Sequence, residues 1–391
     1  MKKFADETKI GRVVNTKEDG CRLQEDIDGQ NGDPLNVSIG EFLPASTTSN
    51  HRLLPKVKIM SLSFLIKLKI LWALNDIEKI YFPILAAIAV PINVVTIVIL
   101  SRAKCGLSKC VTCYLVAMAA ADLLVVIFDL ILRQIPIVYR EQSAFLHYIR
   151  VCNIHAVLLY ASTDCSVWFT VMFSFDRFVA ICCQKLQTKY CTEKTAAVVL
   201  GTVTMLSCMK NIFWYFLYES KYTISNSPWF CVVLSAVSLS LAWAVTELMH
   251  YILTPLIPFI LILLFNALTV RNIIVTSRAR RRLRGGSRGD SPSDPEMANR
   301  RKSMILLFVI SGNFILLWVV FMVCSILKRL EYMWHLVTVS LPTFVQEIGF
   351  MLQLLSCCTN TFIYAVTQRK FRQELINGVK YPHTIIVKLI R

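Results

Sequence analysis

The residues of this chain with the most evident chemistry are Asp176 and Arg177, which are adjacent and lie at one edge of a long apolar segment. A charged pair at the mouth of a membrane helix is costly unless the two groups neutralise each other or meet an aqueous partner. The guanidinium of Arg177 has several N–H donors in a planar fork. It can therefore pair with Asp176 in one state and with another acceptor in a second state. An arginine that only extends toward the membrane surface is the alternative interpretation.

A second acid, Asp122, lies near the middle of another apolar segment. An unpaired carboxylate at that depth costs several kcal/mol, so we expect Asp122 to be protonated or to bind a cation. Polar side chains occur at comparable depth on other segments, namely Asn93, Ser166, Ser356 and Asn360. An interhelical hydrogen-bond network without any ion is the alternative interpretation.

Seven apolar blocks of about 20 residues or more must position these groups, and each has about the length that an α-helix needs to cross a membrane. They run over Tyr81–Ser101, Val111–Arg133, Cys152–Cys183, Thr195–Tyr218, Leu248–Val275, Ser303–Leu327 and Thr343–Val366. The chain is 55% hydrophobic and only 17% charged, which excludes an ordinary soluble domain. The predicted fold class is an all-α membrane protein, a seven-transmembrane helix bundle over residues 81–366.

Basic residues gather on one side of these blocks and account for much of the net charge of +17. They occur after the first and third blocks, in residues 276–302 and in the tail that follows the last block. Because basic connections face the cytoplasm, we predict a multi-pass plasma-membrane protein with its N-terminus outside. Topology explains these clusters better than nucleic-acid binding does, and we expect no nucleic-acid partner.

Residues 276–302 form the longest basic connection and are predicted to be a cytoplasmic loop. Gly285, Gly286, Gly289, Pro292 and Pro295 interrupt any helix over Arg278 to Ser303, so this stretch is expected to be flexible. Arg300-Arg301-Lys302 directly precedes Ser303, and kinases that recognise positive charge favour such serines. Phosphorylation is predicted at Ser291, Ser293 and Ser303.

Residues 1–80 are polar and are predicted to be a disordered extracellular segment. Met60 to Leu74 mixes apolar residues with lysines, is too short to span, and is expected to lie on the membrane surface. No apolar signal peptide opens the chain, and a true start at Met60 is an equally good interpretation. Asn36-Val37-Ser38 matches a glycosylation acceptor, a three-residue pattern that also occurs often by chance.

Two of the fourteen cysteines lie at the predicted outer surface. Cys152 opens the third block and Cys231 follows the fourth. Both meet an oxidising compartment, so a disulfide between them is chemically reasonable. No cysteine or histidine cluster has zinc spacing.

Several residues stand in the order of a known family, and they are Asn93, Asp122, Cys152 with Cys231, Asp176-Arg177-Phe178, Pro258, Phe314 with Trp318, Asn360 to Tyr364, and Lys370-Phe371-Arg372. From about Tyr81 to Leu375 the chain resembles the rhodopsin-like (class A) G-protein-coupled receptors. Ala119 to Asp122, Asp176 to Ala180, and Arg301 to Ser303 are most similar to the orphan group whose better known members respond to aromatic amino acids.

The resemblance implies roles for these residues. Asp176, Arg177, Phe178, Asn360 and Tyr364 form the G-protein coupling switch, and Pro258, Phe314 and Trp318 form a toggle. Asp122, Ser166 and Asn360 form a site for an allosteric sodium ion, the only cofactor expected. Residues 367–391 form an amphipathic eighth helix and a short tail.

The chain also departs from the family pattern. Thr361 and Val320 replace prolines of the seventh and sixth spans, Asn266 replaces a tyrosine, and Thr204 replaces a tryptophan. A missing proline removes a kink. Arg300 stands where many relatives carry an acid, so an ionic latch from Arg177 to the sixth span is not expected.

The ligand pocket is predicted at the outer end of the bundle, above a floor of Phe314 and Trp318. Its candidate residues are Asp129, Arg133, His155, Tyr160, Lys210, Glu247, Gln346 and Glu347. Asp129 and Arg133 are four residues apart, so mutual neutralisation is the alternative for that pair. Leu159 stands where amine receptors place an aspartate, which favours an amino acid or short peptide over a monoamine.

The sequence therefore predicts a receptor that binds an extracellular ligand and activates a heterotrimeric G-protein, with arrestin, receptor kinases and membrane lipids as further partners. A seven-helix protein that scavenges ligand without signalling is the alternative, because the altered switch residues permit it. A transporter is less favoured, since no internal repeat is evident. The sequence contains no nucleotide-binding loop and no catalytic triad, so we do not expect an enzyme.

Overall fold

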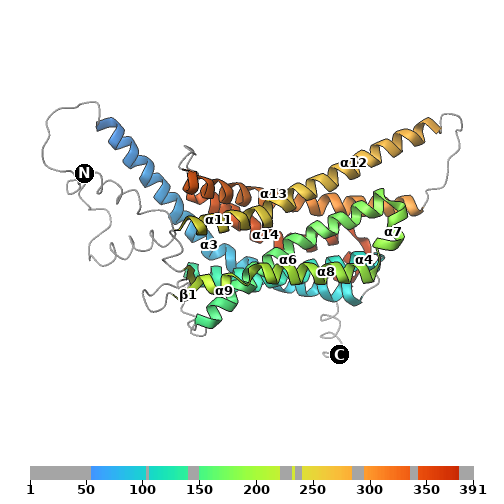
Figure 1. The fold of residues 1–391 in the computed structure, drawn as a ribbon, viewed down its shortest axis with the longest axis horizontal. Coiled ribbons are helices and arrows are strands. Elements are labelled where there is room, and N and C mark those ends of the chain that lie inside the picture. Colours follow the sequence, from blue (N-terminus) through green and yellow to red (C-terminus); the bar gives the residue numbers. More distant parts are fainter. Residues whose placement is uncertain are drawn as a thin grey trace, which may run out of the picture. The chain divides into compact units, whose positions relative to one another are not determined.

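The computed structural model describes residues 54–102, 105–139, 149–220, 231–233, 240–283, 295–334 and 342–377. It divides into two units, residues 1–71 and 72–391, and the second contains the helix bundle. Seven helical segments in the described part are long and apolar enough to cross a membrane. The predicted fold class, an all-α seven-helix bundle, is confirmed (Figure 1). Asn36 lies outside the described residues, so the glycosylation site stays a prediction.

The first helix, α3 (Leu54–Arg102), is longer than predicted. The segment Met60 to Leu74 is continuous with the first span rather than separate from it, and the expectation of disorder up to residue 80 is wrong from Leu54 onward. The reason is that residues 56–82 contain neither glycine nor proline, so nothing there breaks the helix. The interior prolines, Pro83 and Pro91, remain within the helix.

The second span changes its helical form midway. It begins with α4 (Lys109–Val125), where the Ser108 hydroxyl accepts a hydrogen bond from the Val111 amide and caps the helix. It continues as the π-helix η2 (Val126–Gln134) and ends with α5 (Ile135–Tyr139). Such π-helical turns are rare and occur often at functional sites. Asp129 and Arg133 both lie in η2.

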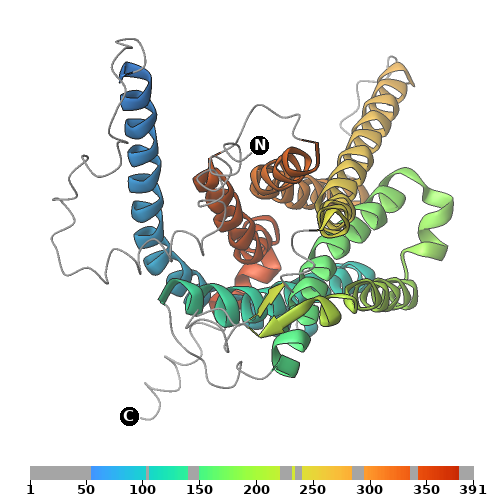
Figure 2. The same ribbon diagram turned by 60° about the vertical axis from the view of Figure 1, so that its left-hand side comes forward.

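The third span, α6 (Ile149–Cys182), packs against helices of the second, fourth, fifth and sixth spans (Figure 2). It is followed by the short α7 (Gln184–Tyr190) and by α8 (Glu193–Asn211), which Thr192 caps. The one-turn α9 (Trp214–Leu217) ends the fourth span. Among the elements against which α6 packs are α4, α8, α12 (Ile257–Leu283) and α13 (Pro295–Trp334).

A small antiparallel hairpin is an addition to the predicted fold. Strand β1 (Tyr218–Ser220) pairs with β2 (Cys231–Val233), with Ser220 opposite Cys231. Both strands pack against α6. Three residues are too few to show the alternation of apolar and polar residues that predicts a strand, so nothing in the sequence indicated this hairpin.

The fifth span consists of α11 (Leu241–Tyr251), the π-helix η5 (Ile252–Leu256) and α12 (Ile257–Leu283), and the sixth is α13 (Pro295–Trp334). Residues 276–283 and 295–302, which we expected in a flexible loop, are therefore helical. Arginine, alanine and leucine extend α12 because they are good helix formers. Pro295 does not break a helix, since it occupies the first position of α13.

The seventh span, α14 (Thr343–Thr367), packs against α13, and a short helix over residues 369–377 follows it. In that short helix Phe371 is buried, whereas Arg369 and Arg372 are exposed, which confirms the amphipathic eighth helix. The Phe371 ring contacts Tyr364, with the ring centroids 6.0 Å apart.

Candidate functional site: two ends of the bundle and a polar cavity between them

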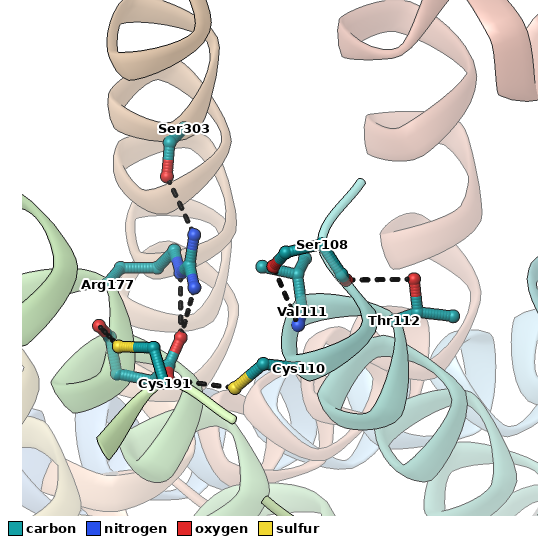
Figure 3. A network of polar contacts seen from close by, with 8 residues as sticks. Ser108, Cys110, Val111, Thr112, Arg177, Cys191 and Ser303 are labelled. Carbon is teal, nitrogen blue, oxygen red and sulfur yellow. Dashed lines mark hydrogen bonds and ion pairs between the residues drawn. The ribbon is translucent and has the colours of Figure 1, made fainter. Parts of the chain in front are cut away.

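Arg177 is held by residues from two spans. Its Nε donates to Asp176 Oδ2 at 2.9 Å, and its Nη2 pairs with the same oxygen. Its Nη1 donates to the Ser303 hydroxyl on α13 at 3.1 Å (Figure 3). Asp176 and Arg177 are both buried, so each charge is compensated inside the protein.

Two thiols complete the surroundings of Asp176. Cys110 Sγ donates to Asp176 Oδ1 at 3.1 Å, and Cys191 Sγ donates to the Asp176 carbonyl at 3.7 Å. Burial, together with the negative charge of Asp176, raises the pKa of Cys191 to about 12, so this thiol stays protonated and able to donate. We call Cys110, Asp176, Arg177, Cys191 and Ser303 the Arg177 cluster. Sequence reasoning missed both thiols, which carry no motif.

The Arg177 cluster also modifies the expectation about a latch. Because position 300 is an arginine, no acid there can pair with Arg177. The third and sixth spans are nevertheless joined through the uncharged hydroxyl of Ser303. A hydrogen bond with one charged partner contributes about 1.5–3 kcal/mol. Phe178 lies on another side of α6, where its ring stacks on Phe265 of α12 at 5.9 Å.

Asp122 lies in a small polar cavity inside the bundle. Ser166 donates to its Oδ1 at 2.6 Å, and Asn360 Nδ2 donates to its Oδ2 at 2.8 Å. The cavity has a volume of about 10 Å³. That is close to the space that one water needs. We call it the Asp122 cavity; it is also lined by Thr170, Ile310, Asn313, Phe314, Trp318 and Ser356.

The residues of the Asp122 cavity fit a small hard cation. The carboxylate of Asp122 and the hydroxyls of Ser166, Thr170 and Ser356 supply oxygen atoms, the ligands that such ions prefer. The sequence-predicted trio of Asp122, Ser166 and Asn360 is thus brought together. Sodium binding itself stays a prediction. No cluster of three or more histidine, cysteine or acidic side chains suited to a metal occurs among the described residues.

The predicted toggle residues lie against this cavity. The Phe314 and Trp318 rings stack with centroids 5.3 Å apart, and both side chains are buried. Trp318 Nε1 donates to the Ser356 hydroxyl at 3.1 Å. Pro258 is buried near the start of α12, but the irregular turn of the fifth span precedes it and contains Pro255.

The seventh span is tied to the first through the Thr361 substitution. The Thr361 and Thr96 hydroxyls are 2.7 Å apart, and Asn93 Nδ2 donates to the Cys357 carbonyl at 2.9 Å. Tyr364 is buried beside Phe371. A residue that stands in place of a proline therefore makes a contact between two spans.

The opposite end of the bundle, which we call the Arg133 end, carries ion pairs. Arg133 Nη1 lies 3.2 Å from Asp129 Oδ1, and Gln134 donates to the same oxygen at 3.3 Å. The structure thus favours mutual neutralisation of Asp129 and Arg133. Glu247 of α11 pairs with Arg329 of α13 at 2.6 Å, a partner that the sequence did not reveal.

Four other predicted pocket residues, His155, Tyr160, Gln346 and Glu347, lie on α6 and α14. His155 Nε2 lies 2.8 Å from the Phe128 carbonyl, which joins α6 to η2. Tyr160 stacks on Trp214 at 4.3 Å and contacts His250 edge-on, so its ring belongs to an aromatic cluster. Gln346 and Glu347 are half-buried near the start of α14.

Lys210, also predicted in the pocket, is bound to an acid that sequence reasoning missed. Its Nζ lies 2.8 Å from Asp164 Oδ2 of α6 and donates to Thr254 of η5 at 2.7 Å. Asn211 donates to Asp164 as well, at 2.5 Å. The charge of Lys210 is thereby compensated inside the bundle. An acid within an apolar span was the signal that could have identified Asp164.

Cys152 is buried and disulfide-bonded. Cys231 begins β2, which packs against α6. The pairing of these two cysteines stays a prediction.

Seven spans, a compensated arginine at one end and ion pairs at the other define a multi-pass helical membrane protein. The model of the family described as 7 transmembrane receptor (rhodopsin family) matches residues 92–364, well over half of the chain. The protein therefore belongs to the rhodopsin family of seven-transmembrane receptors.

Proposed function

We propose that this receptor binds an extracellular ligand at the Arg133 end and activates a heterotrimeric G-protein at the end that contains Arg177. One observation carries the proposal: a hydrogen bond from Arg177 to Ser303 joins α6 to α13 at the end of the bundle that carries the basic connections. Breaking this bond frees Nη1 for an acceptor that enters between the two helices. A G-protein segment that offers a carbonyl or carboxylate suits that donor.

The orientation follows from charge. The connections at the Arg177 end are basic, which supports a cytoplasmic location for that end and an N-terminus outside the cell. The plasma membrane is the location in which an extracellular ligand reaches the Arg133 end. Arrestin and receptor kinases are further partners that would use the same basic face.

The Arg133 end supports a small zwitterionic ligand. Charges of both signs occur there, with Asp129 beside Arg133 and Glu247 beside Arg329. Aromatic rings lie between these elements: Tyr251 contacts Phe321 at 6.1 Å, and Phe321 contacts Phe350 at 5.9 Å. An aromatic amino acid or a short peptide with an aromatic residue matches both features. The resemblance of Ala119 to Asp122 and Asp176 to Ala180 to the orphan group whose better known members respond to aromatic amino acids supports the same ligand class.

The test is a panel of G-protein activation sensors in cells that express the receptor, challenged with aromatic amino acids and short peptides. Arg177→Ala should lower the activation amplitude about tenfold or more, because it removes a charge-assisted contact of about 1.5–3 kcal/mol. Ligand binding should stay nearly unchanged, since Arg177 is far from the Arg133 end. The change leaves the buried Asp176 without its charge partner, so activation is compared at equal surface expression. Basal activity should rise little, because the change that breaks the contact with Ser303 also removes the donor offered to the G-protein segment.

Lys79→Ala is the matched control, because the Lys79 side chain makes a surface ion pair with Asp76 and the backbone carbonyl that accepts from Tyr139 is kept. It should signal like the parent. An Arg177→Ala receptor that reaches the surface and activates with full amplitude would contradict the mechanism. It would favour the ligand-scavenging alternative.

A further inference from the structure

Ser303 combines two features that the proposed coupling mechanism does not use together. Its hydroxyl accepts the hydrogen bond that joins α13 to Arg177, at 3.1 Å. In the sequence it directly follows Arg300-Arg301-Lys302, and protein kinases that recognise basic residues modify such serines. The modifiable oxygen is therefore the same atom that faces the guanidinium.

We infer that Ser303 is a phosphorylation site and that its phosphate forms an ion pair with Arg177 that locks the third and sixth spans together. A kinase would transfer the γ-phosphoryl group of ATP to Ser303 Oγ. The oxygen loses its proton to the kinase base as the new P–O bond forms, and ADP leaves. The product carries a charge of about −1.5 to −2 and three acceptor oxygens where a neutral hydroxyl stood.

The geometry of Arg177 leaves donors for this phosphate. Asp176 occupies Nε and one side of Nη2, and Cys110 holds the other carboxylate oxygen of Asp176. The edge formed by Nη1 and the remaining N–H of Nη2 is directed away from that contact. This edge suits bidentate binding of a phosphate. The guanidinium would then lie between the carboxylate and the phosphate and separate their negative charges.

The same contact determines when the kinase acts. Ser303 is half-buried and its oxygen is engaged with Arg177, so transfer requires that α6 and α13 separate first. The open arrangement is therefore the substrate, and the product stabilises the closed one. Phosphorylation at Ser303 would thus end signalling within the bundle itself, without a bound arrestin.

The experiment uses the full-length receptor purified into lipid nanodiscs, incubated with a basophilic protein kinase and ATP or with the kinase alone. Peptide mapping by mass spectrometry measures phosphate at Ser303, Ser291 and Ser293. The thermal unfolding midpoint is then compared with and without phosphate. We expect phosphate on Ser303 and a rise of about 2 °C or more in the midpoint.

Two variants separate the latch from other effects of phosphate. Ser303→Ala keeps Ser291 and Ser293 available to the kinase and should show no rise. Arg177→Lys keeps the positive charge but lacks the planar fork, so the rise should fall to less than half. Neither measurement uses a ligand or a G-protein, so the result is independent of the proposed coupling.

Three outcomes would overturn the inference. The first is the absence of phosphate on Ser303 while Ser291 or Ser293 is labelled. The second is a lower midpoint after modification of Ser303, as repulsion from Asp176 would cause. The third is an equal rise in the Ser303→Ala receptor, which would assign the effect to other sites.

Discussion

Asp164 accepts hydrogen bonds from Lys210, Asn211 and Thr254, which come from two different spans. Its side chain is 1% exposed, whereas that of Lys210 is 24% exposed. The lysine therefore reaches the acid from the edge of the bundle. Removing one partner of such a pair leaves the other charge buried and uncompensated.

Lys210→Met should therefore destabilise the receptor by about 3–5 kcal/mol, the cost of breaking a buried ion pair. Surface expression should fall, and the purified protein should unfold at a lower temperature. The double variant Asp164→Asn with Lys210→Met should recover much of the loss, because no charge remains unpaired. Equal instability of the single and double variants would show that the cluster matters for shape rather than charge.

Single residues also show how far the site could be predicted. The sequence correctly brought Asp122, Ser166 and Asn360 together, because polar residues at equal depth in neighbouring spans must find one another. It could not assign partners to Lys210 or Glu247, since the rotation of each helix decides which charges face each other. The contact between Thr361 and Thr96 was hidden for the same reason.

At the scale of elements, α13 and α14 lie close together at Gly349. A Cβ added there would lie 2.7 Å from the Phe321 amide nitrogen and 2.9 Å from the Phe321 Cα. Backbone atoms cannot move aside as a flexible side chain can. The residue before Phe321 is Val320, which stands where the family has a proline. The packing of α13 against α14 therefore depends on the absence of a side chain at Gly349.

Gly349→Ala should destabilise the bundle by about 1–3 kcal/mol, the usual cost of overpacking. Thermal unfolding and surface expression would both report the loss. Gly201→Ala is the matched control, because an added Cβ in α8 meets no atom within 4 Å. That change should be neutral or stabilising by up to about 1 kcal/mol, as alanine favours helix over glycine. A Gly349→Ala receptor as stable as the control would exclude the close approach.

The elements differ in how well the sequence predicted them. The seven spans were correct because a membrane-crossing helix needs a long apolar run, and such runs are easy to recognise. The extension of α3 back to Leu54 and that of α12 forward to Leu283 were missed. Hydropathy gives no signal for a helix that continues beyond its apolar part. The hairpin of β1 and β2 was missed because three-residue strands carry no period.

At the scale of the whole molecule, the Asp122 cavity is enclosed by four helices that also contribute to the Arg177 cluster or to the Arg133 end. Ser166 of α6 and Asn360 of α14 hold Asp122 of α4, and Trp318 of α13 bonds to Ser356 in the same cavity. A cavity of about 10 Å³ exists only while these four helices stay together. A bound cation would therefore stabilise this arrangement over one in which α13 has moved away.

Asp122→Asn should remove any stabilisation of the receptor by sodium. The purified parent protein should unfold at a higher temperature in sodium chloride than in choline chloride of equal ionic strength, because an ion that binds only the folded state adds to its stability. The asparagine keeps the size of the side chain but lacks the charge that attracts the ion, so its unfolding temperature should be the same in both salts. Thr202→Val is the control, since this exposed threonine bonds only to its own helix. It should respond like the parent. A parent receptor that unfolds at one temperature in both salts would identify the Asp122 cavity as a hydrogen-bond network without an ion.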